Sequence, residues 1–236
     1  MKDRTLQILN ALIEDFIETA SPVASKHLLV SGEFDISSAT VRNEFAILEE
    51  IGLIESPHIS AGKVPTQKGY RFFVNELLRN KEEELEVQTL FEKHLKEYRF
   101  WKSKETIFDM LKLLAHLSEN VAFTSIENDT TAYLGISNVL RCPEFIHEPE
   151  KAAQIVEILE GQDRFQTMLH SLNMKNQEIK IFIGTENMVE EISSCSMIVA
   201  RFQSQNIKGY MGILGPMRMK YGFNKALLSN VLEMLS

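Results

Sequence analysis

The sequence predicts an α+β chain of two domains, the first small and mainly helical, the second a helix-flanked sheet. Three observations support this. The first 80 residues contain short capped helices separated by turns, a glycine-containing hairpin follows these helices, and beyond residue 120 strand-like apolar runs alternate with helical segments. The 236 residues suffice for about two domains. We expect boundaries at 1–80, at 81–119 for a helical hairpin that links the domains, and at 120–236.

The N-terminal domain is predicted to begin with an amphipathic helix over residues 3–18. Its apolar side chains recur at intervals of three and four residues: Leu6, Leu9, Ile13 and Phe16. A second, short helix is expected to about Leu29, with Ser21 as its N-cap and Pro22 in its first turn.

A third helix is expected after a turn at residues 33–36. Ser37 or Ser38 is its N-cap, and Gly52 is a typical stop after its last turn. Its buried stripe is predicted to be Val41, Phe45, Leu48 and Ile51. Two short helices joined by a turn indicate a helix-turn-helix.

A hairpin should follow, with strands at residues 53–56 and from Val64. Gly62 is expected near its tip, with Lys63 beside it, so that the hairpin forms a wing next to the helix-turn-helix. Thr66 is then predicted to cap a helix that runs to about Leu78.

The remaining elements follow from the same patterns. Residues 82–118 suggest a helical hairpin with two apolar stripes, Val87, Phe91, Leu95 and Tyr98 in the first helix and Ile107, Leu111 and Leu114 in the second. Strands are expected at 121–126, 133–140, 179–184, 195–203 and 207–214, with Gly215-Pro216 as a turn. Helices are expected at 149–172, interrupted near Gly161, and at 223–235.

Charge narrows the class of partner. The net charge of -8 argues against a nonspecific nucleic-acid coat, which needs a broad basic surface. Residues 56–75, however, contain Lys63, Lys68 and Arg71 and no acidic residue. A local cationic patch of this kind is compatible with sequence-specific binding of double-stranded DNA.

Other function classes receive little support. No apolar run is long enough for a membrane span, and the N-terminus does not resemble a signal peptide. The two cysteines, Cys142 and Cys195, form neither a disulfide framework nor a metal motif, which suits a reducing cytoplasm. The six histidines have no metal-ligand spacing. We therefore expect a cytoplasmic protein that is not an enzyme and has no cofactor.

The third helix is the candidate DNA-reading element. Its N-terminus offers backbone N–H groups and hydroxyls to a phosphate, while Arg42 and Asn43 lie off the buried stripe and suit guanine and adenine. The candidate DNA-contacting residues are Ser37, Ser38, Thr40, Arg42, Asn43, His58, Ser60, Gly62, Lys63, Thr66, Lys68, Tyr70 and Arg71. The alternative is a capped surface helix beside an ordinary charged loop. The acid-free stretch makes that alternative less favoured.

Several motifs together resemble the HrcA family of heat-inducible transcription repressors. They are the runs at 37–44, 48–54, 57–58, 60–66 and 68–71, and, in the second domain, 143–145, 181–186 and 212–221. The resemblance implies a winged helix, a GAF-like second domain and a homodimer. It also implies an inverted-repeat operator, the CIRCE element, before chaperone genes, and a repressor whose active state depends on the GroE chaperonin.

The sequence departs from the family pattern at three points. Lys63 stands where the family usually has Arg, and Met217 where it usually has Thr. The chain is also shorter than typical members, as if most of an inserted dimerisation domain after Asn120 were absent.

Two surfaces are candidates for the dimer contact. One is the stripe that begins at Val87 and Phe91, which could instead pack on its own second domain; the other is the Gly215-Pro216 turn with the last helix. A ligand-sensing regulator with a small molecule in the second domain, and an enzyme built on that domain, are the competing functions.

Overall fold

The computed structural model describes residues 3–30, 34, 36–58, 61–77, 81–95, 104–127, 131–204 and 207–235. The chain divides into two compact units, Met1–Arg79 and Asn80–Ser236. Each unit has its own buried core.

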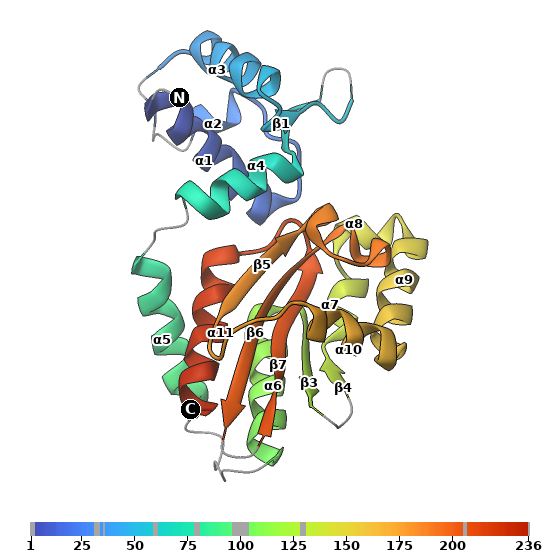
Figure 1. Ribbon diagram of the computed structural model, residues 1–236. Helices are drawn as coiled ribbons and strands as arrows, with labels where there is room; N and C mark the ends of the chain where they lie inside the picture. Colours follow the sequence, from blue (N-terminus) through green and yellow to red (C-terminus); the bar gives the residue numbers. More distant parts are fainter. Residues whose placement is uncertain are drawn as a thin grey trace. The chain divides into compact units, whose positions relative to one another are not determined.

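The first unit is a helical domain with a two-stranded sheet (Figure 1). Its elements are α1 (Asp3–Thr19), α2 (His27–Val30), α3 (Ser38–Glu50), β1 (Ile54–Glu55), β2 (Val64–Pro65) and α4 (Gln67–Phe72), and α4 continues into a π-helical turn (Phe73–Leu77). The two strands are antiparallel, with Ile54 opposite Pro65. This is the helix-turn-helix followed by a wing that the sequence predicts.

Three details of this unit differ from the prediction. The buried face of α1 is rotated toward Ile8 and Leu12, while Leu6 and Phe16 are only half-buried. No helix begins at Ser21, because Val23 pairs with Lys63 as an isolated antiparallel bridge, and α2 starts at His27. Ile51 is 40% exposed rather than buried, since it follows α3 as its C-cap.

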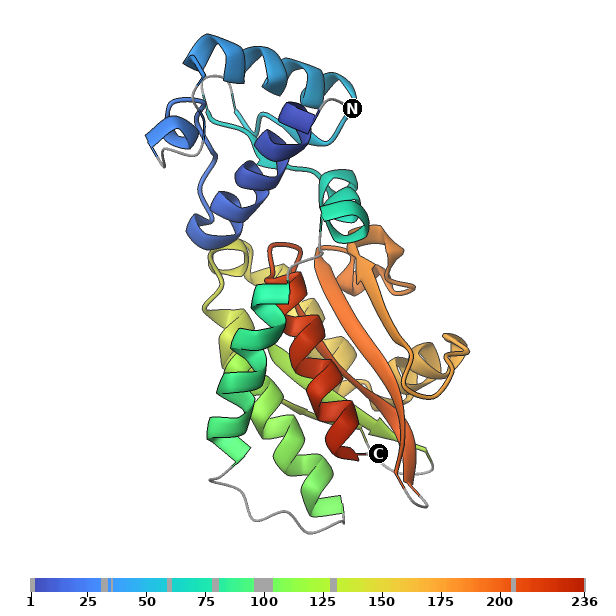
Figure 2. The ribbon, with the colours of Figure 1, turned by 90° about the vertical axis from the view of Figure 1, so that its left-hand side faces the viewer.

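The second unit is built on a five-stranded antiparallel sheet in the order β4-β3-β7-β6-β5. The strands are β3 (Val121–Ile126), β4 (Thr131–Leu134), β5 (Ile179–Ile183), β6 (Cys195–Ser204) and β7 (Ile207–Pro216). Helices α5 (Lys81–Leu95), α6 (Lys104–Ser118) and α11 (Tyr221–Leu235) form a layer on one face (Figure 2).

The opposite face of the sheet is covered by α9 (Pro149–Glu160) and α10 (Gln162–Ser171). Phe165 of α10 meets Phe123 of β3 edge to face, with ring centroids 5.0 Å apart. Because both faces are covered, the central strands are almost continuously buried. The predicted α+β class is confirmed, and the break near Gly161 separates α9 from α10 as expected.

Two predicted features of the second unit differ in the structure. The strand expected at 133–140 ends at Leu134; Gly135 then adopts a left-handed backbone (φ +87°), and α7 (Ile136–Leu140) and α8 (Pro143–Ile146) follow. Gly215 and Pro216 are not a turn, because they pair with Ser196 and Cys195 at the end of β7. Two 3-10 turns lie between β5 and β6, at Gly184–Glu186 and Glu190–Ile192.

The apolar stripe of α5 packs within its own unit. Val87 and Phe91 are buried, and α5 lies against α11. Ile107, Leu111 and Leu114 of α6 are buried too, as predicted. The side chain of Leu95 and all of Tyr98 lie outside the described residues. Of the two uses weighed for this stripe, the structure therefore shows the intramolecular one.

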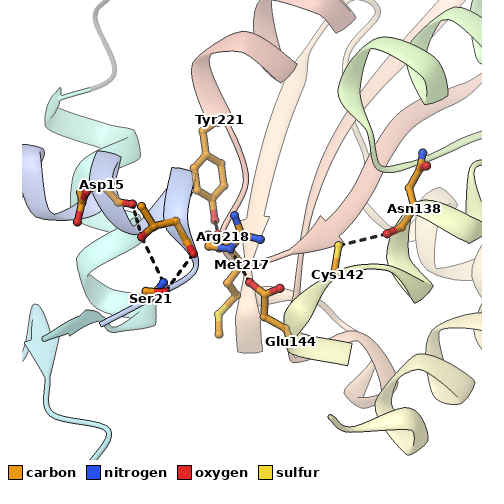
Figure 3. A network of polar contacts seen from close by, with 9 residues as sticks. Asp15, Ser21, Asn138, Cys142, Glu144, Met217, Arg218 and Tyr221 are labelled. Carbon is orange, nitrogen blue, oxygen red and sulfur yellow. Dashed lines mark hydrogen bonds and ion pairs between the residues drawn. The ribbon is translucent and has the colours of Figure 1, made fainter. Parts of the chain in front are cut away.

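The segment between β7 and α11 is tied down by polar contacts (Figure 3). Arg218 Nε donates to Glu144 Oε1 of α8 at 2.7 Å. Tyr221 donates its hydroxyl to the Met217 carbonyl at 2.5 Å and shares a second hydrogen bond with Ser196 at 2.7 Å. The first turn of α11 is thus fixed to the sheet.

Candidate nucleic-acid interface

The N-terminus of α3 is capped by Ser37. Its side chain accepts a hydrogen bond from the Thr40 N–H at 3.1 Å, and the two hydroxyl oxygens are 3.0 Å apart. Of the two serines considered, Ser37 is therefore the cap. The helix end carries exposed N–H groups and a hydroxyl pair, which is the arrangement that favours a DNA phosphate.

The exposed face of α3 carries the side chains that could reach base edges. Val41, Phe45 and Leu48 are buried, whereas Arg42 and Asn43 are exposed as predicted. Ser38 and Thr40 are half-buried at the edge of this face. The full exposed set is Ala39, Arg42, Asn43, Ala46, Ile47, Glu49 and Glu50.

Ala46 and Ile47 are absent from the sequence-based candidates, which in the third helix were limited to polar and charged types. Ile47 is 43% exposed, although it is a large apolar side chain. Apolar groups on such a helix suit the methyl group of thymine. The sequence could have indicated these two positions, because they follow Arg42 and Asn43 by one helical turn and so lie on the same face of the helix.

Arg42 is lightly held. Its Nε donates to Ser25 Oγ at 3.4 Å, a long hydrogen bond to the turn that precedes α2. The rest of the guanidinium makes no hydrogen bond to a described residue. Its planar pair of donors is therefore available for a two-pronged contact with guanine.

The opposite face of α3 is anchored to α1 by a buried carboxylate. Glu44 is 3% exposed and accepts hydrogen bonds from Arg4 at 2.9 and 2.5 Å and from Thr5 at 2.7 Å. This network fixes the rotation of α3, and with it the direction in which Arg42 and Asn43 point.

Lys63, expected to contact DNA, is held inside the domain. Its Nζ lies 2.5 Å from Glu49 Oε2 of α3 and 2.7 Å from Ser56 Oγ, and its side chain is only 18% exposed. The hydrogen bond from Lys63 is the main cause of a lowered pKa for Glu49. This geometry does not favour the predicted phosphate contact.

Gly62, Thr66 and Lys68 also have structural partners. A Cβ on Gly62 would lie 2.5 Å from the carbonyl carbon of Val23, so glycine here permits close backbone approach rather than forming an open tip. Thr66 caps α4, accepting from the Gly69 N–H at 3.1 Å, and donates to the Gly52 carbonyl at 2.7 Å. Lys68 donates to the Ile51 carbonyl at 2.7 Å, just after the end of α3.

The prediction for Tyr70 is wrong, because the side chain is 3% exposed and belongs to the core of the unit. Its neighbour Arg71 is half-buried and lies within 3.5 Å of Asn75 Oδ1. His58 is exposed, as a DNA contact would require, and Ser60 lies outside the described residues. The candidate interface thus centres on Ser37, Thr40, Arg42 and Asn43.

The second unit offers no reactive thiol in its interior. Cys195 is fully buried at the start of β6, and burial raises the pKa of its thiol to about 12. Cys142 is half-buried, and burial raises its pKa as well. In the part of the chain that the structure describes, no three His, Cys, Asp or Glu residues are grouped to hold a metal ion.

We expect Cys195 to resist alkylation in the folded protein. At pH 8 a thiol with a pKa of about 12 is ionised on the order of one part in ten thousand, and the thiolate is the reactive form. N-ethylmaleimide followed by peptide mass spectrometry should find Cys195 modified only after denaturation. Labelling of Cys195 at equal rates in native and denatured protein would contradict its burial.

No helix within the described ranges combines the length and the apolar character that a membrane crossing requires.

Comparison with known proteins gives consistent matches over both units. A family model described as the winged helix-turn-helix transcription repressor, HrcA DNA-binding, matches residues 2–79, and one described as the HrcA protein C terminal domain matches residues 62–223. The heat-inducible transcription repressor HrcA of Halalkalibacterium halodurans is 27% identical, with 94% of this chain and 92% of the relative covered. That of Bacillus pumilus is 26% identical, with 100% and 97% covered.

These relatives are longer. The alignment with the Halalkalibacterium protein has 321 positions and takes in 94% of the 236 residues, about 222, so about 99 positions have no counterpart in this chain. Among solved structures, a crystal structure of a hypothetical protein has a TM-score of 0.81 at 19% identity, with 100% of this chain and 98% of that chain covered. That likeness concerns the fold alone.

Proposed function

This chain belongs to the HrcA family of heat-inducible transcription repressors, and from that premise we propose that it binds an inverted-repeat operator of the CIRCE type before chaperone genes as a homodimer. The observation that supports DNA reading most directly is the exposed face of α3. Arg42 and Asn43 stand there side by side, one turn from a helix N-terminus capped by Ser37. Such a helix fits the major groove, with its N-terminal residues toward the bases.

The dimer is proposed from the symmetry of the operator. An inverted repeat matches a two-fold axis in the protein, and a single small winged helix seldom binds tightly alone. Of the two surfaces considered from the sequence, Val87 and Phe91 of the first and Gly215 and Pro216 of the second are buried. This chain also lacks the positions of the longer relatives that have no counterpart in the alignment.

A dimer of this chain therefore needs contacts beyond these four residues. Leu140 of α7 and Ile146 of α8 are apolar side chains of the second unit that are 51% and 57% exposed. We propose that a limited contact between second units includes these side chains, and that operator DNA stabilises it by holding two protomers together.

Chaperonin dependence rests on the family resemblance. If the active state is scarce in the isolated chain, chaperonin raises the fraction of protein that binds DNA without changing the operator contacts.

The test combines two measurements. Electrophoretic shifts compare an inverted-repeat operator with scrambled DNA, each with and without chaperonin; a specific shift that chaperonin increases is expected. Light scattering at micromolar protein, with and without operator, reports the assembly state. A monomer under both conditions contradicts the dimer, and equal affinity for scrambled DNA contradicts specific repression.

A further inference from the structure

The base of the wing is joined to the end of α3 by three side chains. Here the wing means β1, β2 and the residues between them. We infer that Glu49 and Lys63 are positioning residues, which hold the wing at a fixed place beside α3 so that both can engage one DNA site. The inference rests on the proposed DNA interface and assigns Lys63 a role through geometry rather than through phosphate contact.

The backbone of Lys63 is held first. Its N–H donates to the Val23 carbonyl at 2.9 Å, and the Val23 N–H donates to the Lys63 carbonyl at 2.8 Å. Val23 is fully buried, and Gly62 allows the two segments to approach closely. The stem of the Lys63 side chain therefore starts from a fixed point.

The ammonium group is held second. It donates to Glu49 Oε2 at 2.5 Å and to Ser56 Oγ at 2.7 Å, and Ser56 in turn donates to Glu49 Oε1 at 3.2 Å. Glu49 belongs to α3, Ser56 directly follows β1, and Lys63 directly precedes β2. Two of the three ammonium hydrogens are used within the domain.

Glu49 stands at a sensitive point of the interface. It follows Arg42 by seven residues, which places both on one face of α3, about 10 Å apart along the axis. An unpaired carboxylate there would repel the phosphates of a bound duplex, and Lys63 neutralises it. Glu50 lies beside it, is exposed and makes no ion pair with a described residue.

The alternative, in which Lys63 contacts phosphate, predicts the opposite change in operator affinity for E49Q. If Glu49 only masks a lysine that contacts phosphate, E49Q frees the ammonium, tightens operator binding and steepens its salt dependence. If the pair positions the wing, E49Q lets the wing move, and operator binding weakens by about five- to tenfold in a dimer, equivalent to about 1 to 1.4 kcal/mol.

The experiment measures operator affinity, salt slope and thermal midpoint of the full chain for E49Q, K63M, their double variant, K63R and E50Q. We expect E49Q and K63M to weaken binding to a similar extent, the double variant to be no weaker than either, and K63R to retain affinity within about twofold because Arg keeps the ion pair. E50Q is the matched control: it removes the same charge without a pair, so its affinity should stay equal or rise.

Hydroxyl-radical footprinting adds a readout that general loss of stability does not produce. In E49Q, protection at the centre of each half-site should persist while protection at the flank reached by the wing is lost. Tighter binding by E49Q, additive losses in the double variant, or a uniformly fainter footprint would each overturn the inference. Should K63M fail to fold, the sign of the E49Q effect still decides.

The wild-type measurement separates this inference from the proposed function. No specific shift by the wild-type chain refutes the proposed operator binding itself. A normal wild-type shift with the wrong variant pattern refutes only the positioning role.

Discussion

Arg42→Ala is expected to abolish operator-specific binding and to leave the fold intact. The side chain is exposed on α3, and its one hydrogen bond to a described residue, 3.4 Å to Ser25, is long. A good base contact contributes about 1–3 kcal/mol and occurs twice in a symmetric dimer. The expected loss is therefore about 2–6 kcal/mol, roughly 30-fold to more than 10,000-fold in affinity.

Electrophoretic shifts with operator and scrambled DNA measure this loss. Residual binding to scrambled DNA should fall much less, because phosphate contacts elsewhere remain. Arg42→Lys should restore little, since Lys lacks the planar pair of donors. Arg141→Ala is the matched control, an exposed arginine of the second unit. Unchanged operator affinity in Arg42→Ala would remove Arg42 from the interface.

Helix α3 was predictable because its signals are local. A capping serine, a stripe at Val41, Phe45 and Leu48, and a glycine after the last turn all lie within 16 consecutive residues. These signals fix which side chains face the core, and hence that Arg42 and Asn43 face solvent. The capping role of Thr66 is local in the same sense.

The side-chain contacts of the wing could not be predicted, because the residues that it contacts are distant in sequence. The residues next to Lys63 in the sequence do not indicate that Glu49, 14 residues earlier, pairs with it. The same holds for Ser21, where a capping signal yields to the pairing of Val23 with Lys63. Tyr70 sits between two cations in sequence, yet the phase of α4 turns it into the core.

Two predictions at glycine residues of the second unit are wrong. Gly215-Pro216 has the composition of a turn, but a Cβ at Gly215 would lie 1.9 Å from Asn120 Oδ1, so this glycine serves close packing within a strand. Gly135 is the reverse case: it ends a strand that apolar content alone extends to residue 140, because its left-handed backbone begins α7.

Arg4→Ala is expected to destabilise the first unit strongly while removing no exposed DNA contact. Glu44 is 3% exposed, and without Arg4 its buried carboxylate loses the ion pair and both hydrogen bonds from the guanidinium, while the hydrogen bond from Thr5 remains. Breaking a buried ion pair costs about 3–5 kcal/mol. We expect about 3 kcal/mol, the low end, because Arg4 is 47% exposed and water can enter. For a domain of this size that lowers the thermal midpoint by about 12–24 °C.

Calorimetry of the full chain measures the shift in thermal midpoint. Arg42→Ala is the control, because it also removes one positive charge from the first unit, here from α3, but does not leave a buried carboxylate behind. The pair Arg4→Ala with Glu44→Leu separates charge burial from lost packing. Replacing the carboxylate by an apolar side chain of similar volume removes the buried charge that Arg4 neutralises, so the double variant should recover most of the stability lost in Arg4→Ala. A double variant as unstable as Arg4→Ala would show that the contribution of Arg4 is packing of its stem against the domain rather than neutralisation of Glu44.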